Sequence, residues 1–163
     1  IKTKKNMLEF TYPFIPPSLN SLYGVNNKRV YMHSHGKAYK AAFLEWCKDN
    51  LFKEISKLKI DAYDCFSLHV TIYFPLEDLV NDKYGKDGRV KSPFKRVDID
   101  NRIKLLQDCV AVLIGGDDKQ IFNIDFTKKV AKTAKEKRVD IRINKENLFD
   151  FVGEIERKNG KSG

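Results

Sequence analysis

The stretch Val97–Asp118, V-D-I-D-N-R-I-K-L-L-Q-D-C-V-A-V-L-I-G-G-D-D, gathers carboxylates at both ends of one amphipathic segment. Its apolar residues recur at intervals of three and four, which predicts a helix over residues 101–114 that Gly115 and Gly116 end. Hard divalent cations bind several oxygen ligands, and clustered carboxylates repel one another without a cation between them. The stretch therefore predicts a helix with a metal site.

The segments around this helix alternate between strand and helix patterns. A second amphipathic helix is expected over Lys37–Leu58, and the K-T-A-K-E-K turn before Arg138 predicts an antiparallel hairpin between the last two strands. Alternating apolar residues place the strands at residues 7–12, 66–74, 122–126 and 139–143. The order β-α-β-α-β-β predicts an α/β (α+β) fold, a mixed sheet of about four strands with two main helices packed on it in one layer.

Three further regions lack these patterns. The segment Pro13–Gly36 is too rich in Pro, Asn and Gly for regular structure, and long loops of this kind are often functional. Residues 76–96 have little periodicity and are expected to form a flexible surface excursion. We expect one domain over residues 1–145, followed over 146–163 by a short helix at Glu146–Ile155 and a frayed tail.

The chain is basic. Lys and Arg number 31 against 22 Asp and Glu among 163 residues, a net charge of +9 that favours nucleic acid, although membrane phosphates could use the same charge. No apolar run approaches the roughly 20 residues of a spanning helix, and the first residues lack the apolar core of a signal peptide, so we expect a cytoplasmic protein without a membrane partner. Cys47, Cys65 and Cys109 stand among apolar neighbours without C-x-x-C spacing, and we expect buried thiols, neither a disulfide nor zinc.

The acids at the start of the long helix are spaced for chemistry. Asp98 and Asp100 lie two residues apart, and in an extended segment both carboxylates point to the same side and can face one ion. Lys104 follows Asp100 by four residues, so one helical turn places its ammonium on the face of that carboxylate, where it could neutralise charge on a cleaved phosphate. The alternative is that Asp100 caps the helix and Lys104 forms a surface ion pair with Asp108.

The motif D-I-D-N-R-I-K-L-L-Q-D, followed by G-G-D-D-K-Q-I, resembles the signature of the RusA family of Holliday-junction resolvases, crossover junction endodeoxyribonucleases of bacteria and phages. P-P-S-L-N-S-L-Y and H-G-K-A-Y-K resemble the family's opening and the start of its basic helix, so the likeness covers Phe10–Ile143. The length of the excursion and the tail after Asn144 depart from the family pattern. The resemblance implies a Mg²⁺-dependent endodeoxyribonuclease, with Mn²⁺ able to substitute, that resolves four-way junctions by paired symmetric nicks in recombination and repair.

The resemblance also implies roles for single residues. Lys104 is the essential lysine, and it would stabilise the charge that develops when a metal-activated water attacks the phosphate. The implied metal-binding acids are Asp98, Asp100 and Asp118. The implied supporting positions are Asn101, Asp108 and Asp117.

The length of the helix raises a geometric problem. A straight helix over residues 101–114 is roughly 20 Å long at about 1.5 Å per residue, and it separates Asp100 from Asp118. One hypothesis is a homodimer in which two such helices pack antiparallel, so that Asp117 or Asp118 of one chain lies near Asp98 and Asp100 of the other. The other hypothesis is that the strand after Asp118 folds back and the acids meet within one chain.

Two basic groups are candidate DNA contacts. Lys28 and Arg29 lie with tyrosines in the long loop, as on many nucleic-acid surfaces, although an ordinary solvated loop explains them equally well. Lys91, Lys95 and Arg96 lead directly into Asp98, so a phosphate cut at the acids would lie close to their charges.

Two other functions fit the same residues. A non-catalytic dimer that binds branched DNA would use the acids only as caps and ion pairs, and a missing acid would favour it, yet every motif position is filled. A nuclease directed at flaps or nicked duplex would use the same metal site. Only a comparison of DNA substrates separates that enzyme from a resolvase.

Overall fold

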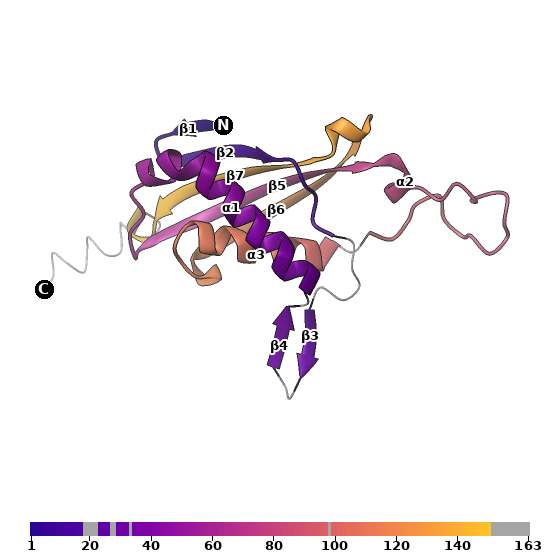
Figure 1. Cartoon of the computed structure of the whole chain (residues 1–163), viewed down its shortest axis with the longest axis horizontal. Coiled ribbons are helices and arrows are strands. Elements are labelled where there is room, and N and C mark those ends of the chain that lie inside the picture. The colour runs from indigo at the N-terminus through magenta and orange to yellow at the C-terminus, as the bar shows by residue number, and fades with distance from the viewer. Residues whose placement is uncertain (18–22, 27–28, 33, 98, 151–163) are drawn as a thin grey trace, which may run out of the picture.

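The computed structural model of the protein describes residues 1–163 except 18–22, 27–28, 33, 98 and 151–163. Its centre is a mixed sheet made of β1 (Lys2–Lys4), β2 (Met7–Tyr12), β5 (Asp64–Pro75), β6 (Ile121–Ala131) and β7 (Arg138–Asn147). The five strands lie in the order β1-β2-β7-β5-β6 (Figure 1). All neighbours are antiparallel except β5 and β6, which run parallel.

Two long helices, α1 (Ser34–Lys57) and α3 (Ile99–Leu113), cover one face of this sheet (Figure 1). Both are amphipathic, as predicted, and their apolar sides pack against the alternating apolar residues of β5. The core residues contributed by these three elements are Phe43, Cys47, Leu51, Phe66, Leu68, Val70, Ile72, Phe74, Leu105, Leu106, Cys109 and Val110, each at most 3% exposed. The α+β class and the mixed sheet are therefore confirmed.

The structure adds elements to the six that the sequence predicts. They include β1, the short helix α2 (Leu76–Leu79) and the 3-10 turns η1 (Asp118–Gln120) and η2 (Ala134–Glu136). These elements are three or four residues long, too short to show a periodic pattern of apolar residues.

The predicted hairpin between the last two strands is wrong. β6 and β7 lie on opposite sides of β5, with Val70 paired to Phe126 on one side and to Ile141 on the other. β5 carries fully buried residues at every second position, and the central place gives both of its backbone edges hydrogen-bond partners. α3 lies in the connection between β5 and β6, as parallel neighbours require a long crossover.

The long segment after β2 is also more regular than predicted. Strands β3 (Tyr23–Asn26) and β4 (Arg29–Met32) form an antiparallel pair that projects beyond the N-terminal end of α1 (Figure 1). Val25 pairs with Val30 in this ladder. Valine and tyrosine favour strands, which explains why these residues pair although the segment as a whole is rich in Pro, Asn and Gly.

Two further boundaries differ from the prediction. β7 continues to Asn147, so Glu146 and Asn147 belong to a strand; residues 148–150 are helical, and the rest of the expected terminal helix lies outside the described residues. The excursion over residues 76–96 has an ordered base, where Val80 forms a bridge with Phe94 and the Asn81 N–H donates to the Pro93 carbonyl at 2.7 Å. In the described ranges, no helix is long and apolar enough to span a membrane.

Candidate functional site

α3 has a charged side and a buried side. Asp100, Lys104 and Asp108 follow one another at four-residue intervals, which places them along one stripe of the helix. Asp100 and Lys104 are exposed, and Asp108 is half-buried. Because the apolar side of α3 is held in the core, the charged stripe is presented outward on a rigid element.

At its N-terminal end, α3 begins at Ile99, so Asp100 already lies in the first helical turn. The prediction that Asp98 and Asp100 share an extended segment is therefore wrong for Asp100, while Asp98 itself lies outside the described residues. Ile99 is half-buried and extends the apolar side of the helix by one turn, which explains the earlier start. A carboxylate in the first turn is stabilised by the positive end of the helix.

At its C-terminal end, α3 is closed by a glycine cap. Gly115 has a φ of +70°, and the Gly116 N–H donates to the Ala111 carbonyl at 3.1 Å, as the sequence predicts for this end of the helix. The chain then turns into η1, where the Asp117 carboxylate accepts a hydrogen bond from the Lys119 N–H at 3.4 Å. This turn holds Asp117 and Asp118 next to each other on the surface.

These two carboxyl groups influence each other. A hydrogen bond between them lowers the pKa of Asp117 and raises the pKa of Asp118. Slight desolvation and the negative charges of Asp117 and Asp108 raise the pKa of Asp118 further. Asp118 is therefore within electrostatic reach of Asp108, the last acid of the charged stripe.

The two acids of the charged stripe are spaced along α3. Asp100 and Asp108 are separated by about 12 Å of helix at 1.5 Å per residue. In the part of the chain that the structure describes, no three His, Cys, Asp or Glu side chains come close enough to hold a metal ion. The candidate donors are all carboxylates, which a hard cation prefers. The residues fit a hard cation in kind, and one of the three predicted ligands, Asp98, lies outside the described residues.

The candidate DNA contacts fall in two places. Lys91, Lys95 and Arg96 are exposed on the segment that returns from the excursion to α3, and the Lys95 ammonium donates to the Glu77 carbonyl at 2.7 Å. Arg29 begins β4, but its side chain and the whole of Lys28 lie outside the described residues.

Sequence reasoning missed Arg102. This arginine is 3% exposed, and its guanidinium carbon lies 4.9 Å from the centre of the Phe74 ring. The signal was present, because residue 102 falls on the apolar side of the helix between Ile99 and Leu106, where a charged residue is unusual. Arg102 also lines a pocket of about 230 Å³ beside the start of α3.

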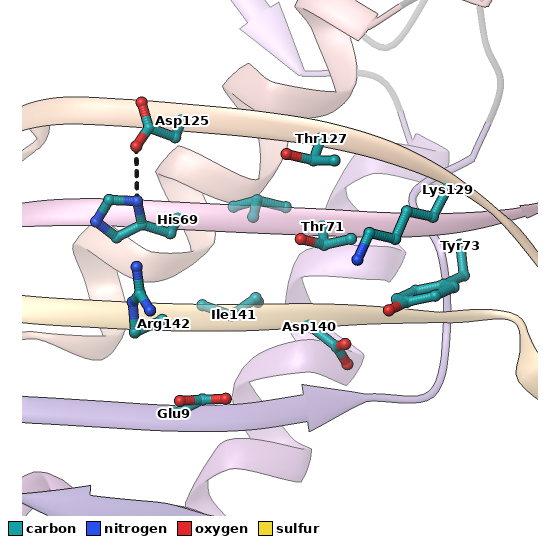
Figure 2. Close-up of a pocket in the computed structure, with 11 residues that line it drawn as sticks. Glu9, His69, Thr71, Tyr73, Asp125, Thr127, Lys129, Asp140, Ile141 and Arg142 are labelled. Carbon is teal, nitrogen blue, oxygen red and sulfur yellow. Dashed lines mark ion pairs between the residues drawn. The ribbon is translucent and has the colours of Figure 1, made fainter.

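The sheet face away from α1 and α3 carries a second polar group that sequence reasoning assigned no chemistry. There, His69 Nδ1 lies 2.7 Å from the Asp125 carboxylate, and Arg142 points toward the imidazole from β7 (Figure 2). These side chains line a pocket of about 330 Å³ together with Glu9 and Thr71. Polar side chains on neighbouring strands can pair with one another on an open sheet face. The sheet lies between these side chains and the acids of α3.

A basic α+β protein that aligns carboxylates along one helix, with lysine and arginine beside them, has the features of a metal-dependent nuclease. The family model for Endodeoxyribonuclease RusA matches residues 13–144, and the chain belongs to this family. It is therefore an endodeoxyribonuclease, which hydrolyses phosphodiester bonds in DNA, and nucleases of this family depend on a metal ion. The match includes all of α3 and the Asp117–Asp118 turn. No curated protein matches the chain.

Proposed function

We propose that the chain is a Mg²⁺-dependent resolvase, active as a homodimer, that cuts DNA four-way junctions by paired symmetric nicks. The observation that carries this proposal is the charged stripe of α3, Asp100, Lys104 and Asp108, continued by Asp117 and Asp118, in a member of the RusA family. Recombination and repair are the processes that such cleavage serves. Mn²⁺ is expected to substitute for Mg²⁺ because both accept carboxylate oxygens.

The proposed roles follow from the positions of the residues. Lys104 lies one helical turn beyond Asp100 and is exposed, so its ammonium can stabilise negative charge on a phosphate held at that carboxylate. When bound, the ion supplies an activated water and a polarised phosphate. The proposed metal ligands are Asp98, Asp100 and Asp118. The proposed supporting residues are Asn101, Asp108 and Asp117. The proposed phosphate contacts are Lys28, Arg29, Lys91, Lys95 and Arg96.

An exposed apolar groove beside the stripe supports the homodimer. Phe52 of α1 is 71% exposed and Val112 of α3 is 48% exposed, and both line a groove of about 300 Å³ with Leu44 and Ile55. In a two-fold dimer with antiparallel α3 helices, a second copy would cover Val112. The same arrangement carries Asp118 of one chain toward Asp100 of the other, so that the proposed ligands would come from both chains.

The test is cleavage of a synthetic mobile four-way junction, with linear duplex and flap DNA as controls, in Mg²⁺ or in chelator. Wild type is compared with Asp100→Asn, which keeps the size of the side chain and removes its charge. We expect symmetric nicks in the junction alone, lost in chelator and in the variant, while the variant still binds the junction.

Other outcomes would give the chain another function. Preferential cutting of flap or nicked duplex by wild type would identify a nuclease with the same site and a different substrate. Tight binding of the junction without cleavage, at any divalent metal tried, would contradict the resolvase proposal and leave a DNA-binding dimer.

A further inference from the structure

The turn that carries Asp117 and Asp118 is tied to the sheet by the side chain of Gln120. Inside η1, the Gln120 backbone N–H donates to the Asp117 carbonyl at 3.1 Å, and the Ile121 N–H donates to the Asp118 carbonyl. The Gln120 side chain is left for a longer reach, and its Nε2 donates to the carbonyl of Asp64, the first residue of β5, at 3.0 Å. This amide therefore links the acid pair to the start of β5.

The acceptor of this hydrogen bond is fixed in position. The Asp64 side chain is buried, and its carboxylate accepts from the Asp61 N–H at 2.8 Å and pairs with the Lys145 ammonium at 3.4 Å. The same ammonium donates to the carbonyl of Leu58, the residue that follows α1. Separating a buried ion pair is strongly unfavourable, so this network holds Asp64 in one place. Gln120 is thus anchored to a rigid part of the fold.

Gly116 makes room for the Gln120 side chain. A Cβ at residue 116 would overlap Oε1 of Gln120 and would lie 3.1 Å from its Cδ. The φ of Gly116 lies outside the left-handed region, so the glycine is needed here for space and not for backbone conformation. The Gln120 side chain lies against the Gly116 backbone, and Asp117 and Asp118 form the loop of chain between these two residues.

We propose that Gln120 is a positioning residue of the nuclease, which holds Asp118 where it can bind the metal ion, and that Gly116 serves this role by admitting the Gln120 side chain. The proposal rests on the proposed function, in which Asp118 is a metal ligand. Asp117 and Asp118 are exposed, so hydrogen bonds and not burial must keep them in place. A misplacement of about 1 Å at a reacting centre can cost on the order of 10²-fold in rate.

The first test is a double-mutant cycle on cleavage of the four-way junction in Mg²⁺. Gln120→Ala removes the hydrogen bond to Asp64, and Gly116→Ala displaces the Gln120 amide from it. We expect each variant to lower the maximal cleavage rate about tenfold, as outer-shell partners of a metal site do, with unchanged binding of the junction in chelator. Because both substitutions act through one hydrogen bond, the double variant should lose about tenfold and not about a hundredfold.

A second measurement does not depend on cleavage. Amide hydrogen exchange in chelator follows the N–H groups of Gln120 and Ile121, which close the turn. Gln120→Ala and Gly116→Ala should each speed this exchange by roughly two- to tenfold, the effect of one lost hydrogen bond. Each should also weaken the binding of Mn²⁺ alone, measured by calorimetry, by about tenfold.

Three further variants make the result specific. Gln120→Met keeps the length of the side chain but not the donor, and it should cut as slowly as Gln120→Ala. The Asn50 side chain also donates to a backbone carbonyl, that of Trp46 within α1, at 2.8 Å, and Asn50→Leu should leave cleavage and exchange in the turn at their wild-type values. Gly88→Ala adds a Cβ that meets no atom within 4 Å and should also behave as wild type.

The proposal is overturned if the double variant loses the product of the two single effects, if Gln120→Met cuts at the wild-type rate, or if exchange in the turn is the same in all variants. Failure of wild type to cut the junction, with exchange and Mn²⁺ binding still changed alike by Gln120→Ala and Gly116→Ala, would reject the proposed function and support the positioning role.

Discussion

The two ends of α3 differ in what surrounds their acids. At the N-terminal end, Lys104 follows Asp100 by one helical turn, and a pocket near the start of the helix is lined by Lys95, Arg96 and Arg102. At the C-terminal end, Asp118 lies beside Asp117 and within electrostatic reach of Asp108, and the neighbouring surface is an apolar groove. One end is suited to hold phosphates, and the other is suited to contact protein.

This difference has a consequence for how the enzyme is built. At the C-terminal end, a hydrogen bond joins the Asp117 and Asp118 carboxyl groups. The cations that we propose as phosphate contacts include Lys95 and Arg96, which line the pocket near the N-terminal end. The two ends of a helix as long as α3 cannot come together, because the helix is a rigid rod. Joining unlike ends of two chains, as we propose, would bring the phosphate-binding end and the acid pair together.

The largest expected effect comes from mixing variants of the two ends. Asp100→Asn and Asp118→Asn should each lower junction cleavage at least 10²-fold, the upper end of what even an outer-shell partner contributes to a metal site. If the ends of different chains form each site, a mixed dimer has one intact site and one that lacks both acids. Mixing the two proteins should therefore restore nicking of one strand, measured on labelled junctions after subunit exchange.

A matched mixture shows whether this recovery is specific. Asp100→Asn mixed with Lys104→Met changes the same end of α3 in both chains, so neither site is intact and nicking should stay low. No recovery in the first mixture, with exchange verified by size-tagged chains, would mean that the acids meet within one chain.

The next effect concerns the apolar groove at the C-terminal end. Val112→Asp places a charge in a surface that the proposed dimer buries, and an unpaired buried charge is strongly unfavourable. We expect sedimentation velocity to show a monomer with unchanged circular dichroism and with loss of paired nicking. Tyr84→Ser, which removes an exposed ring from the excursion, should leave the oligomeric state of wild type. A Val112→Asp protein that still sediments as a dimer would place the interface elsewhere.

A smaller effect is expected at the cap between α3 and the acid pair. Gly115 has a φ of +70°, where a Cβ costs about 1–2 kcal/mol, and an added Cβ would meet no atom within 4 Å, so only backbone strain acts. Gly115→Ala should lower the free energy of unfolding by this amount in urea denaturation. Gly88→Ala is the control, because its Cβ also meets nothing and its φ is outside the left-handed region. If Gly115→Ala and Gly88→Ala were equally stable, the left-handed glycine cap at Gly115 would be contradicted.

The last effect appears only in alkaline solution and concerns the buried side of α3 and its neighbour α1. Burial raises the pKa of the Cys47 and Cys109 thiols from 9.0 to about 12. Above pH 9 the unfolded chain loses these protons and the folded chain keeps them, so the unfolded state binds fewer protons and stability falls as pH rises. The expected slope is about 1 kcal/mol per pH unit for each thiol between pH 9 and 12, measured by denaturation. Replacing both cysteines by alanine should flatten the slope, and an unchanged slope would assign it to other groups.

Much of the candidate site could be predicted because it lies in consecutive residues. The four-residue spacing of Asp100, Lys104 and Asp108 places them on one stripe wherever the helix forms, and Gly115 ends that helix before Asp117. Arg102 could not be recognised in the same way. Its burial depends on Phe74, which reaches it from another element, and its pocket depends on α2 and on the return of the excursion.

By itself, the sequence determined the amphipathic helices, the alternating strands and the order of acids along α3, because these follow from local periodicity and steric rules. Only the tertiary structure decided that β5 lies between β6 and β7, that β3 and β4 pair in the long segment after β2, and that a buried arginine lines a basic pocket. Strand neighbours and pocket walls come from segments far apart in the chain, and the burial that selects among their possible pairings is a property of the whole core.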